Sequence, residues 1–209
     1  MKISYAITVC SEFVEIQRLL NFLLKNKRHE DEIIILFDSE NGDPEVEIYL
    51  RAKCISNEYL WIPYKFDGHF ANMKNKLTSL CGGDYVFQID ADEIPNESLI
   101  ENLPTMLESN PDVDVYLVPR INTVKGLTQE HINKWRWKVD DKGWVNFPDY
   151  QWRIYRNNST VTWKNKVHEV LEGHKQFAPL PAFEEFCLYH PKTIEKQEKQ
   201  NAYYDTLIT

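Results

Sequence analysis

Short apolar runs alternate with segments of helical periodicity over residues 1–120, and this alternation constrains the fold more than any other feature of the chain. Residues 3–9 and 84–89 are typical of strands, and apolar residues recur at helical spacing over residues 14–26. The run at 33–38 is continuously apolar until its last residue, as expected of a central parallel strand covered on both faces. Strand and helix in alternation predict an α/β fold with a mostly parallel sheet flanked by helices.

The chain changes in character after Arg120. Residues 121–150 are rich in aromatic side chains and have weak periodicity, short strand-like pieces follow, and a polar helix is predicted over 193–207. In the first half, Gly82 and Gly83 are expected to end a helix, and Pro104 is expected to break another. No internal repeat or linker separates the halves. We therefore predict one domain, with residues 1–120 as its α/β half and 121–209 as a smaller mixed elaboration.

Composition excludes several classes of protein. The chain has 209 residues, 43% of them hydrophobic, which suffices for one domain with a real core. Its net charge of −8 provides no field to attract nucleic acid. The four cysteines form no C-x-x-C pair, and no apolar run is long enough for a signal peptide or a membrane span. We expect a cytoplasmic protein without a transmembrane segment, for which peripheral contact with a membrane stays open.

Three carboxylates, Asp90, Asp92 and Glu93, directly follow the predicted strand 84–89. Each like-charged neighbour makes ionisation of the next one harder, so a positive group is expected beside them. Asp90 and Asp92 are two residues apart, a spacing that points both side chains to one side of a strand end. Two oxygen ligands of this kind suit Mg²⁺ or Mn²⁺, with water and substrate phosphate completing the shell. The plain alternative is a solvated acidic turn.

A second strand, at 33–38, also ends in a carboxylate, that of Asp38. Ligands of parallel sheets bind beyond the carboxyl ends of the strands, so Asp38 and the acidic cluster are expected at one site. The alternative for Asp38 is an Asx-turn that closes its own strand.

Residues 70–93, FANMKNKLTSLCGGDYVFQIDADE, resemble the family 2 glycosyltransferases of the GT-A fold. In that family a helix with a basic-Asn pair, here Lys74-Asn75, leads into a buried strand and then Asp-x-Asp. ITVCSE (7–12) resembles the family's first strand and nucleotide loop, and ILFDSENGD (35–43) resembles its second strand. The resemblance implies a GT-A, Rossmann-like fold in which residues 1–120 bind a nucleotide-sugar.

The second half resembles, more loosely, a bacterial subset related to lipopolysaccharide-core sugar transferases. The stretches that carry this resemblance are DYQWRIYRN (149–157), VHEVL (167–171) and YHP (189–191). It implies that residues 121–209 face the acceptor. The aromatic segment 121–147 has no counterpart in the family.

The resemblance also implies roles for individual residues. Asp92 would contact the metal, Asp90 the ribose or the metal, and His190 would complete the metal shell. The residues expected to bind the nucleotide part of the donor, together with Asp90, are Thr8, Glu12, Asp38, Lys74, Arg153 and His168. For each the alternative is a structural charge, a helix start or an ion pair.

An inverting transfer needs a general base that takes the proton of the acceptor hydroxyl. The predicted candidates are Asp149 and, behind it, Glu169, in a nearly apolar cleft that would raise the pKa of the carboxylate. Trp135, Trp137 and Trp144 are candidate stacking platforms for sugar rings, with core packing as the alternative.

The expected function is metal-dependent, inverting hexosyl transfer from a nucleotide-sugar, foremost a UDP-sugar, to a hydroxyl of a glycan, lipid-linked or other acceptor. One alternative is nucleotidyl transfer, but TVCSEFVE (8–15) contains neither the glycine nor the basic residue that would hold a triphosphate. An aspartate-based phosphatase would carry its Asp-x-Asp after the first strand. The non-enzymatic alternative is a domain that binds a nucleotide or glycan without turnover.

Overall fold

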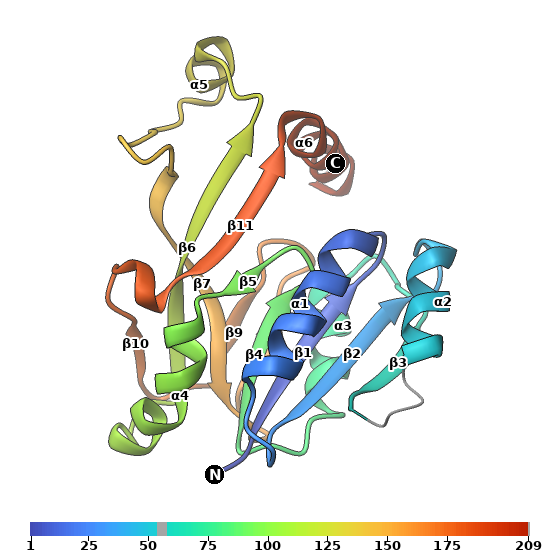
Figure 1. The fold of residues 1–209 in the computed structure, drawn as a ribbon, viewed down its shortest axis with the longest axis vertical. Coiled ribbons are helices and arrows are strands. Elements are labelled where there is room, and N and C mark those ends of the chain that lie inside the picture. Colours follow the sequence, from blue (N-terminus) through green and yellow to red (C-terminus); the bar gives the residue numbers. More distant parts are fainter. Residues whose placement is uncertain (54–57, 209) are drawn as a thin grey trace.

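The computed structural model describes residues 1–53 and 58–208, and one nine-stranded sheet runs through both halves of the chain. Its strand order is β3-β2-β1-β4-β7-β6-β11-β5, with β10 added beside β6 (Figure 1). The first four strands are parallel: β1 (Ile3–Val9), β2 (Glu32–Asp38), β3 (Leu60–Tyr64) and β4 (Tyr85–Asp90). The predicted α/β fold with a mostly parallel sheet is confirmed.

Helices cover both faces of this sheet, which explains why its strands are apolar throughout. One face is covered by α1 (Phe13–Asn26), α2 (Pro44–Lys53) and α4 (Glu97–Ser109). The other is covered by α3 (Phe70–Thr78) and by a small hairpin of β8 (Thr162–Lys164) and β9 (Val170–Glu172). The core therefore lies in two layers, and the sheet edge where the parallel strands end is left for a site.

The second half adds strands to the same sheet. β7 (Val145–Arg156) lies antiparallel between β4 and β6 (Val115–Lys125), and β11 (Leu188–Thr193) runs parallel to β6. The segment that joins β6 to β7 projects from the end of these strands as an arm that carries α5 (Gln129–Trp135) (Figure 1). The short strands are β5 (Ile94–Pro95) and β10 (Phe177–Pro179), a 3-10 turn spans Glu184–Phe186, and α6 (Ile194–Ile208) follows β11. No helix within the described ranges is both long and apolar enough to cross a bilayer.

Two local predictions were wrong. Helix α4 continues through Pro104, because its buried face, with Leu99, Leu103 and Leu107, outweighs the hydrogen bond that proline cannot donate. Helix α3 ends at Thr78, before the two glycines, and Gly83 serves another purpose. A Cβ at Gly83 would lie 2.7 Å from the backbone nitrogen of Ser4, so this position allows the chain to pass close to β1.

Candidate functional site

A cavity of about 440 Å³ lies at the end of β4, and residues of the neighbouring strands β6, β7 and β11 line it as well. This volume is within the usual range for a small-molecule site. The predicted site residues that line it are Lys74, Asp90, Asp92, Asp149, Arg153, His168, Glu169 and His190. Residues far apart in sequence thus meet in one cleft, because parallel strands and the β7 and β11 additions share this edge.

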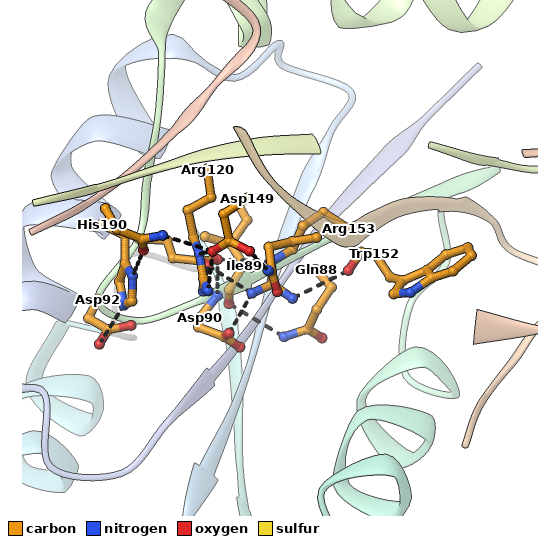
Figure 2. Close-up of polar contacts among 12 residues, drawn as sticks. Gln88, Ile89, Asp90, Asp92, Arg120, Asp149, Trp152, Arg153 and His190 are labelled. Carbon is orange, nitrogen blue, oxygen red and sulfur yellow. Dashed lines mark hydrogen bonds and ion pairs between the residues drawn. The ribbon is translucent and has the colours of Figure 1, made fainter. Parts of the chain in front are cut away.

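Glu93 joins the two arginines of the site in one charge network. Figure 2 draws the polar contacts around Asp90, Arg120 and Arg153. The side chain of Glu93 has no solvent exposure and accepts hydrogen bonds from Arg153 Nε at 3.0 Å and Nη2 at 2.7 Å. Arg120 Nη1 donates to it at 3.0 Å, and the backbone N–H of Asp90 donates at 3.2 Å. The positive charge expected beside the three carboxylates is therefore supplied by two arginines of the chain itself.

Asp90 ends β4 and is engaged by the protein through both carboxylate oxygens. Arg153 Nη2 donates to Oδ2 at 2.7 Å, and Thr8 Oγ1 donates to Oδ1 at 3.3 Å. Burial by itself would raise the pKa of Asp90, but Arg153 and then Lys74 outweigh it and hold the pKa well below the usual range. Asp90 is thus an ionised group of fixed orientation in the floor of the cleft.

Asp92 and His190 form a second pair, on the side of Asp90 that faces away from Arg153 (Figure 2). His190 Nε2 lies 3.4 Å from Asp92 Oδ2, and Lys196 Nζ of α6 lies 3.3 Å from the same oxygen. Burial would raise the pKa of Asp92, but the contact with His190 and the charge of Lys196 lower it overall. Burial lowers the pKa of His190, against the opposing effect of Asp92, so its imidazole is neutral at physiological pH.

The hydrogen bonds of Asn122 determine which nitrogen of His190 is free. Asn122 Nδ2 donates to Asp149 at 2.8 Å, so its Oδ1 faces His190 Nδ1, 2.6 Å away, and accepts from it. The lone pair of His190 is then on Nε2, beside Asp92. Metal-ligating histidines commonly donate their other ring N–H to a neighbouring oxygen in this way, which fixes the tautomer and the orientation of the ring.

One carboxylate and one neutral imidazole fit a divalent cation such as Mn²⁺ or Mg²⁺. Within residues 1–53 and 58–208, no group of three or more His, Cys, Asp or Glu side chains forms a complete metal cage. Mg²⁺-type sites usually take only one or two protein ligands and complete the shell with water and substrate phosphate. The donor set of Asp92 and His190 therefore fits the predicted metal, and the role itself stays a prediction.

Asp149 lies on β7 and faces the cleft with its carboxylate held in place. Arg120 donates to Oδ2 from Nε at 2.9 Å and Nη2 at 2.8 Å, and Gln151 donates to Oδ1 at 2.7 Å. The sequence predicted a nearly apolar cleft that would raise the pKa of this carboxylate, and this prediction was wrong. Burial acts in that direction, but Arg120 and then Asn122 lower the pKa of Asp149 overall, because the cleft is lined with charges.

Glu169, the other candidate base, forms an ion pair with Lys74 at 3.2 Å. Lys74 is almost fully buried and lies over the ring of Trp163, 4.7 Å from its centroid. His168 precedes Glu169 with a φ of 54°, a conformation that L residues rarely adopt and that clusters at functional sites. The loop that carries His168 and Glu169 is thus held against α3 and turned toward the cleft.

Three of the predicted nucleotide contacts do not line the cavity: Thr8, Glu12 and Asp38. Thr8 reaches Asp90, as described above. Glu12 accepts from the backbone N–H groups of Cys10 and Ser11, and Asp38 accepts from those of Glu40 and Asn41. These contacts of Asp38 are those of the Asx-turn that was the alternative. That Asp38 binds the nucleotide stays a prediction.

Of the three candidate tryptophan platforms, Trp137 alone lines the cavity. Trp135 packs between His131 and Trp137, with ring centroids at 5.3 and 4.6 Å, and Trp144 packs on Phe147 at 4.8 Å. The aromatic segment therefore forms the packed arm of β6, α5 and β7, and it presents one ring to the site.

The structure brings several residues to the site that were not among the predicted site residues. These are Arg120 in the network, Asn122 beside His190, and Lys192 and Lys196 on and after β11; Glu93 was predicted only as a member of the acidic cluster. Arg120 directly follows the apolar run VYLVP (115–119), much as Asp38 and Asp90 follow apolar runs, and this was the available signal. Lys192 and Lys196 follow His190 in a polar stretch that offers no distinguishing pattern.

A Rossmann-like sheet with Asp-x-Asp at the carboxyl end of β4, facing strands added from a mixed second half, defines a domain of the GT-A type. The model of the family described as "Glycosyl transferase family 2" matches residues 4–175. The chain belongs to this family.

Solved structures support the fold assignment. S. aureus TarS 1–349 in complex with UDP-GlcNAc is similar with a TM-score of 0.64 and 14% identity, over 92% of this chain and 59% of that one. TarS 1–349 in complex with UDP has a TM-score of 0.61 and 16% identity, over 91% of this chain and 60% of that one. The mannosyltransferase PcManGT from Pyrobaculum calidifontis, in complex with GDP-Man and Mn²⁺, has a TM-score of 0.50 and 15% identity, over 56% of this chain and 35% of that one. The chain thus spans about 60% of the length of TarS 1–349, and at these identities the likeness shows the fold.

Proposed function

We propose that this chain transfers a hexosyl group, with inversion, from a nucleotide-sugar to a hydroxyl group of a glycan or lipid-linked acceptor. A UDP-sugar is the foremost donor, and the reaction uses Mn²⁺ or Mg²⁺. The observation that carries the proposal is that Asp92, His190 and Asp149 line one cleft, at the sheet edge where ligands of parallel sheets bind. Structures of TarS with UDP-GlcNAc and of PcManGT with GDP-Man and Mn²⁺ support the class of donor and of cofactor.

Asp92 Oδ2 and His190 Nε2 would hold the cation in this proposal. When bound, the cation would neutralise charge on the leaving nucleoside diphosphate. The chain's own residues prepare the site: Asn122 keeps the imidazole of His190 in the ligating tautomer, and Arg153 fixes Asp90 in the floor. Asp90 then contributes an ionised carboxylate for the ribose or the cation.

Asp149 is the proposed general base. A single displacement at the anomeric carbon requires a group that accepts the proton of the acceptor hydroxyl. The lowered pKa of Asp149 keeps it ionised at neutral pH, and Arg120 and Asn122 fix its orientation through Oδ2. The proton would pass to Oδ1, whose only described partner is the side chain of Gln151. The resemblance of residues 149–157 to lipopolysaccharide-core sugar transferases supports a glycan as the acceptor.

A thermal-shift screen of nucleoside mono-, di- and triphosphates and of nucleotide-sugars, each with Mn²⁺ and with EDTA, tests this function. A ligand that binds only the native state raises the melting temperature, by about 5–10 °C at 100 times its Kd for a chain of this size. We expect a Mn²⁺-dependent shift with one nucleoside diphosphate and its sugar conjugate. A shift with triphosphates alone would instead indicate nucleotidyl transfer. The absence of any shift would contradict a nucleotide-sugar enzyme.

Replacing the proposed base should separate binding from transfer. Asp149→Asn is expected to leave the Mn²⁺-dependent shift with the donor unchanged and to lower the transfer rate about 100-fold or more, since proton transfer alone is lost. Glu169→Gln is the matched comparison at the other candidate base, which also lines the cleft. Transfer should be measured as release of the nucleoside diphosphate in the presence of acceptor. Full activity of both variants would show that neither carboxylate is the base.

A further inference from the structure

The Lys and Arg side chains that line the cleft differ in whether they form an ion pair with a carboxylate. All but one have a carboxylate partner: Lys74 with Glu169, Arg120 with Asp149 and Arg153 with Asp90. Lys192 is the exception among the described residues, since it lines the cavity without an ion pair to a carboxylate. Its ammonium donates instead to the neutral side-chain amide of Gln200 on α6.

The strand geometry of β11 places this ammonium beside the proposed cation site. His190 and Lys192 are two residues apart on β11, so their side chains lie on the same face. Their partners in the register with β6 are Asn122 and Val124, and all four residues line the cavity. A half-buried cation on that face, held by a neutral amide, remains available for an anion from solution.

We propose that Lys192 binds the diphosphate of the nucleotide-sugar donor and neutralises it as the leaving group. The inference rests on the proposed function and extends it. A diphosphate next to Asp92 and His190 would need positive charge besides the divalent cation, and the other cleft cations are already paired. Because Gln200 is uncharged, it orients the ammonium of Lys192 without neutralising it.

The test compares UDP and GDP with uridine and guanosine in the wild-type chain and in Lys192→Gln, by calorimetry with Mn²⁺ and with EDTA. We expect the Kd for the diphosphate that binds to rise about tenfold or more in Lys192→Gln, as for the loss of one charge-assisted hydrogen bond. The Kd for the corresponding nucleoside should change less than about twofold, since the nucleoside has no phosphate. Lys192→Arg, which keeps the charge, should restore most of the diphosphate affinity.

Lys76→Gln is the matched control, because Lys76 lies exposed on α3, away from the cleft. It changes the net charge equally and should leave both Kd values unchanged. If the wild type binds UDP or GDP and Lys192→Gln binds it equally well, the inference on Lys192 is wrong while the proposed function stands. If the wild type binds neither diphosphate under either condition, both are overturned. A rate defect of Lys192→Gln with unchanged diphosphate affinity would assign Lys192 to the acceptor and would also overturn the inference.

Gln200→Glu gives a second, independent measurement. The substitution is nearly isosteric and supplies Lys192 with the carboxylate partner that it lacks. We expect the Kd for the diphosphate to rise in this variant, and to rise less when it is introduced into Lys192→Gln. Additive effects in this double-mutant cycle would show that Gln200 does not act through Lys192.

Discussion

Asp92→Asn is expected to lower the rate of sugar transfer by roughly 10³-fold while leaving the fold intact, because it removes the anionic ligand of the proposed cation. Asp92 follows β4, and its carboxylate contacts His190 and Lys196. The substitution keeps the volume of the side chain. The Mn²⁺-dependent thermal shift with a nucleoside diphosphate should disappear together with activity, and the melting temperature without ligand should change by only a few degrees.

Asp112→Asn serves as the control for Asp92→Asn. Asp112 is an exposed aspartate in the loop before β6, so the same change of charge should leave activity and melting temperature unaltered. A drop of many degrees in the melting temperature of Asp92→Asn would assign Asp92 a structural role. Full turnover with an intact fold would show that the cation, if used, is held elsewhere.

Glu93→Gln should destabilise the protein by about 3–5 kcal/mol, the usual result of removing one charge from a buried ion-pair network. Glu93 has no solvent exposure, and Arg120 and Arg153 both donate to it. The neutral amide would turn an NH₂ group toward one of these guanidinium groups and leave positive charge uncompensated under the cleft. The measurement is urea unfolding, read as the free energy of unfolding extrapolated to water.

Glu97→Gln is the matched control for this stability prediction. Glu97 begins α4 four residues later and forms an exposed pair with Lys25 at 3.4 Å. Exposed pairs contribute at most about 1 kcal/mol, so this variant should unfold close to the wild type. A loss of less than about 1 kcal/mol in Glu93→Gln would mean that the two arginines are balanced by Asp90 and Asp149 without it.

Much of the first half was predictable from local pattern. The strands predicted over 3–9, 33–38 and 84–89 were recognisable because a strand covered on both faces must be apolar along its length. The position of the site followed from the same pattern, since polar groups at the ends of parallel strands gather at one edge. Helix α4 shows the limit of such reasoning: Pro104 predicts a break locally, and packing of the helix against the sheet overrides it.

The electrostatic partners could not be predicted in the same way. Glu93 was visible as a third carboxylate in the cluster, yet its two arginines come from β6 and β7, and Arg153 is 60 residues away along the chain. The pKa of Asp149 was expected to rise in an apolar cleft and is lowered, because Arg120 donates to its carboxylate. A pKa depends on the charges within a few ångströms, and those neighbours are determined by strand order.

The sequence by itself determined the fold class, the edge of the sheet that carries the site, and the need for positive charge beside Asp90, Asp92 and Glu93. These properties depend on residue periodicity and on the repulsion of neighbouring carboxylates, which act over a few residues. Only the tertiary structure decided that Arg120 and Arg153 supply that charge, that Asn122 sets the tautomer of His190, and that Lys192 is left without a carboxylate among the described residues. These pairings depend on distances between side chains from β4, β6, β7 and β11, and such distances exist only once the strands have assembled in one order and register.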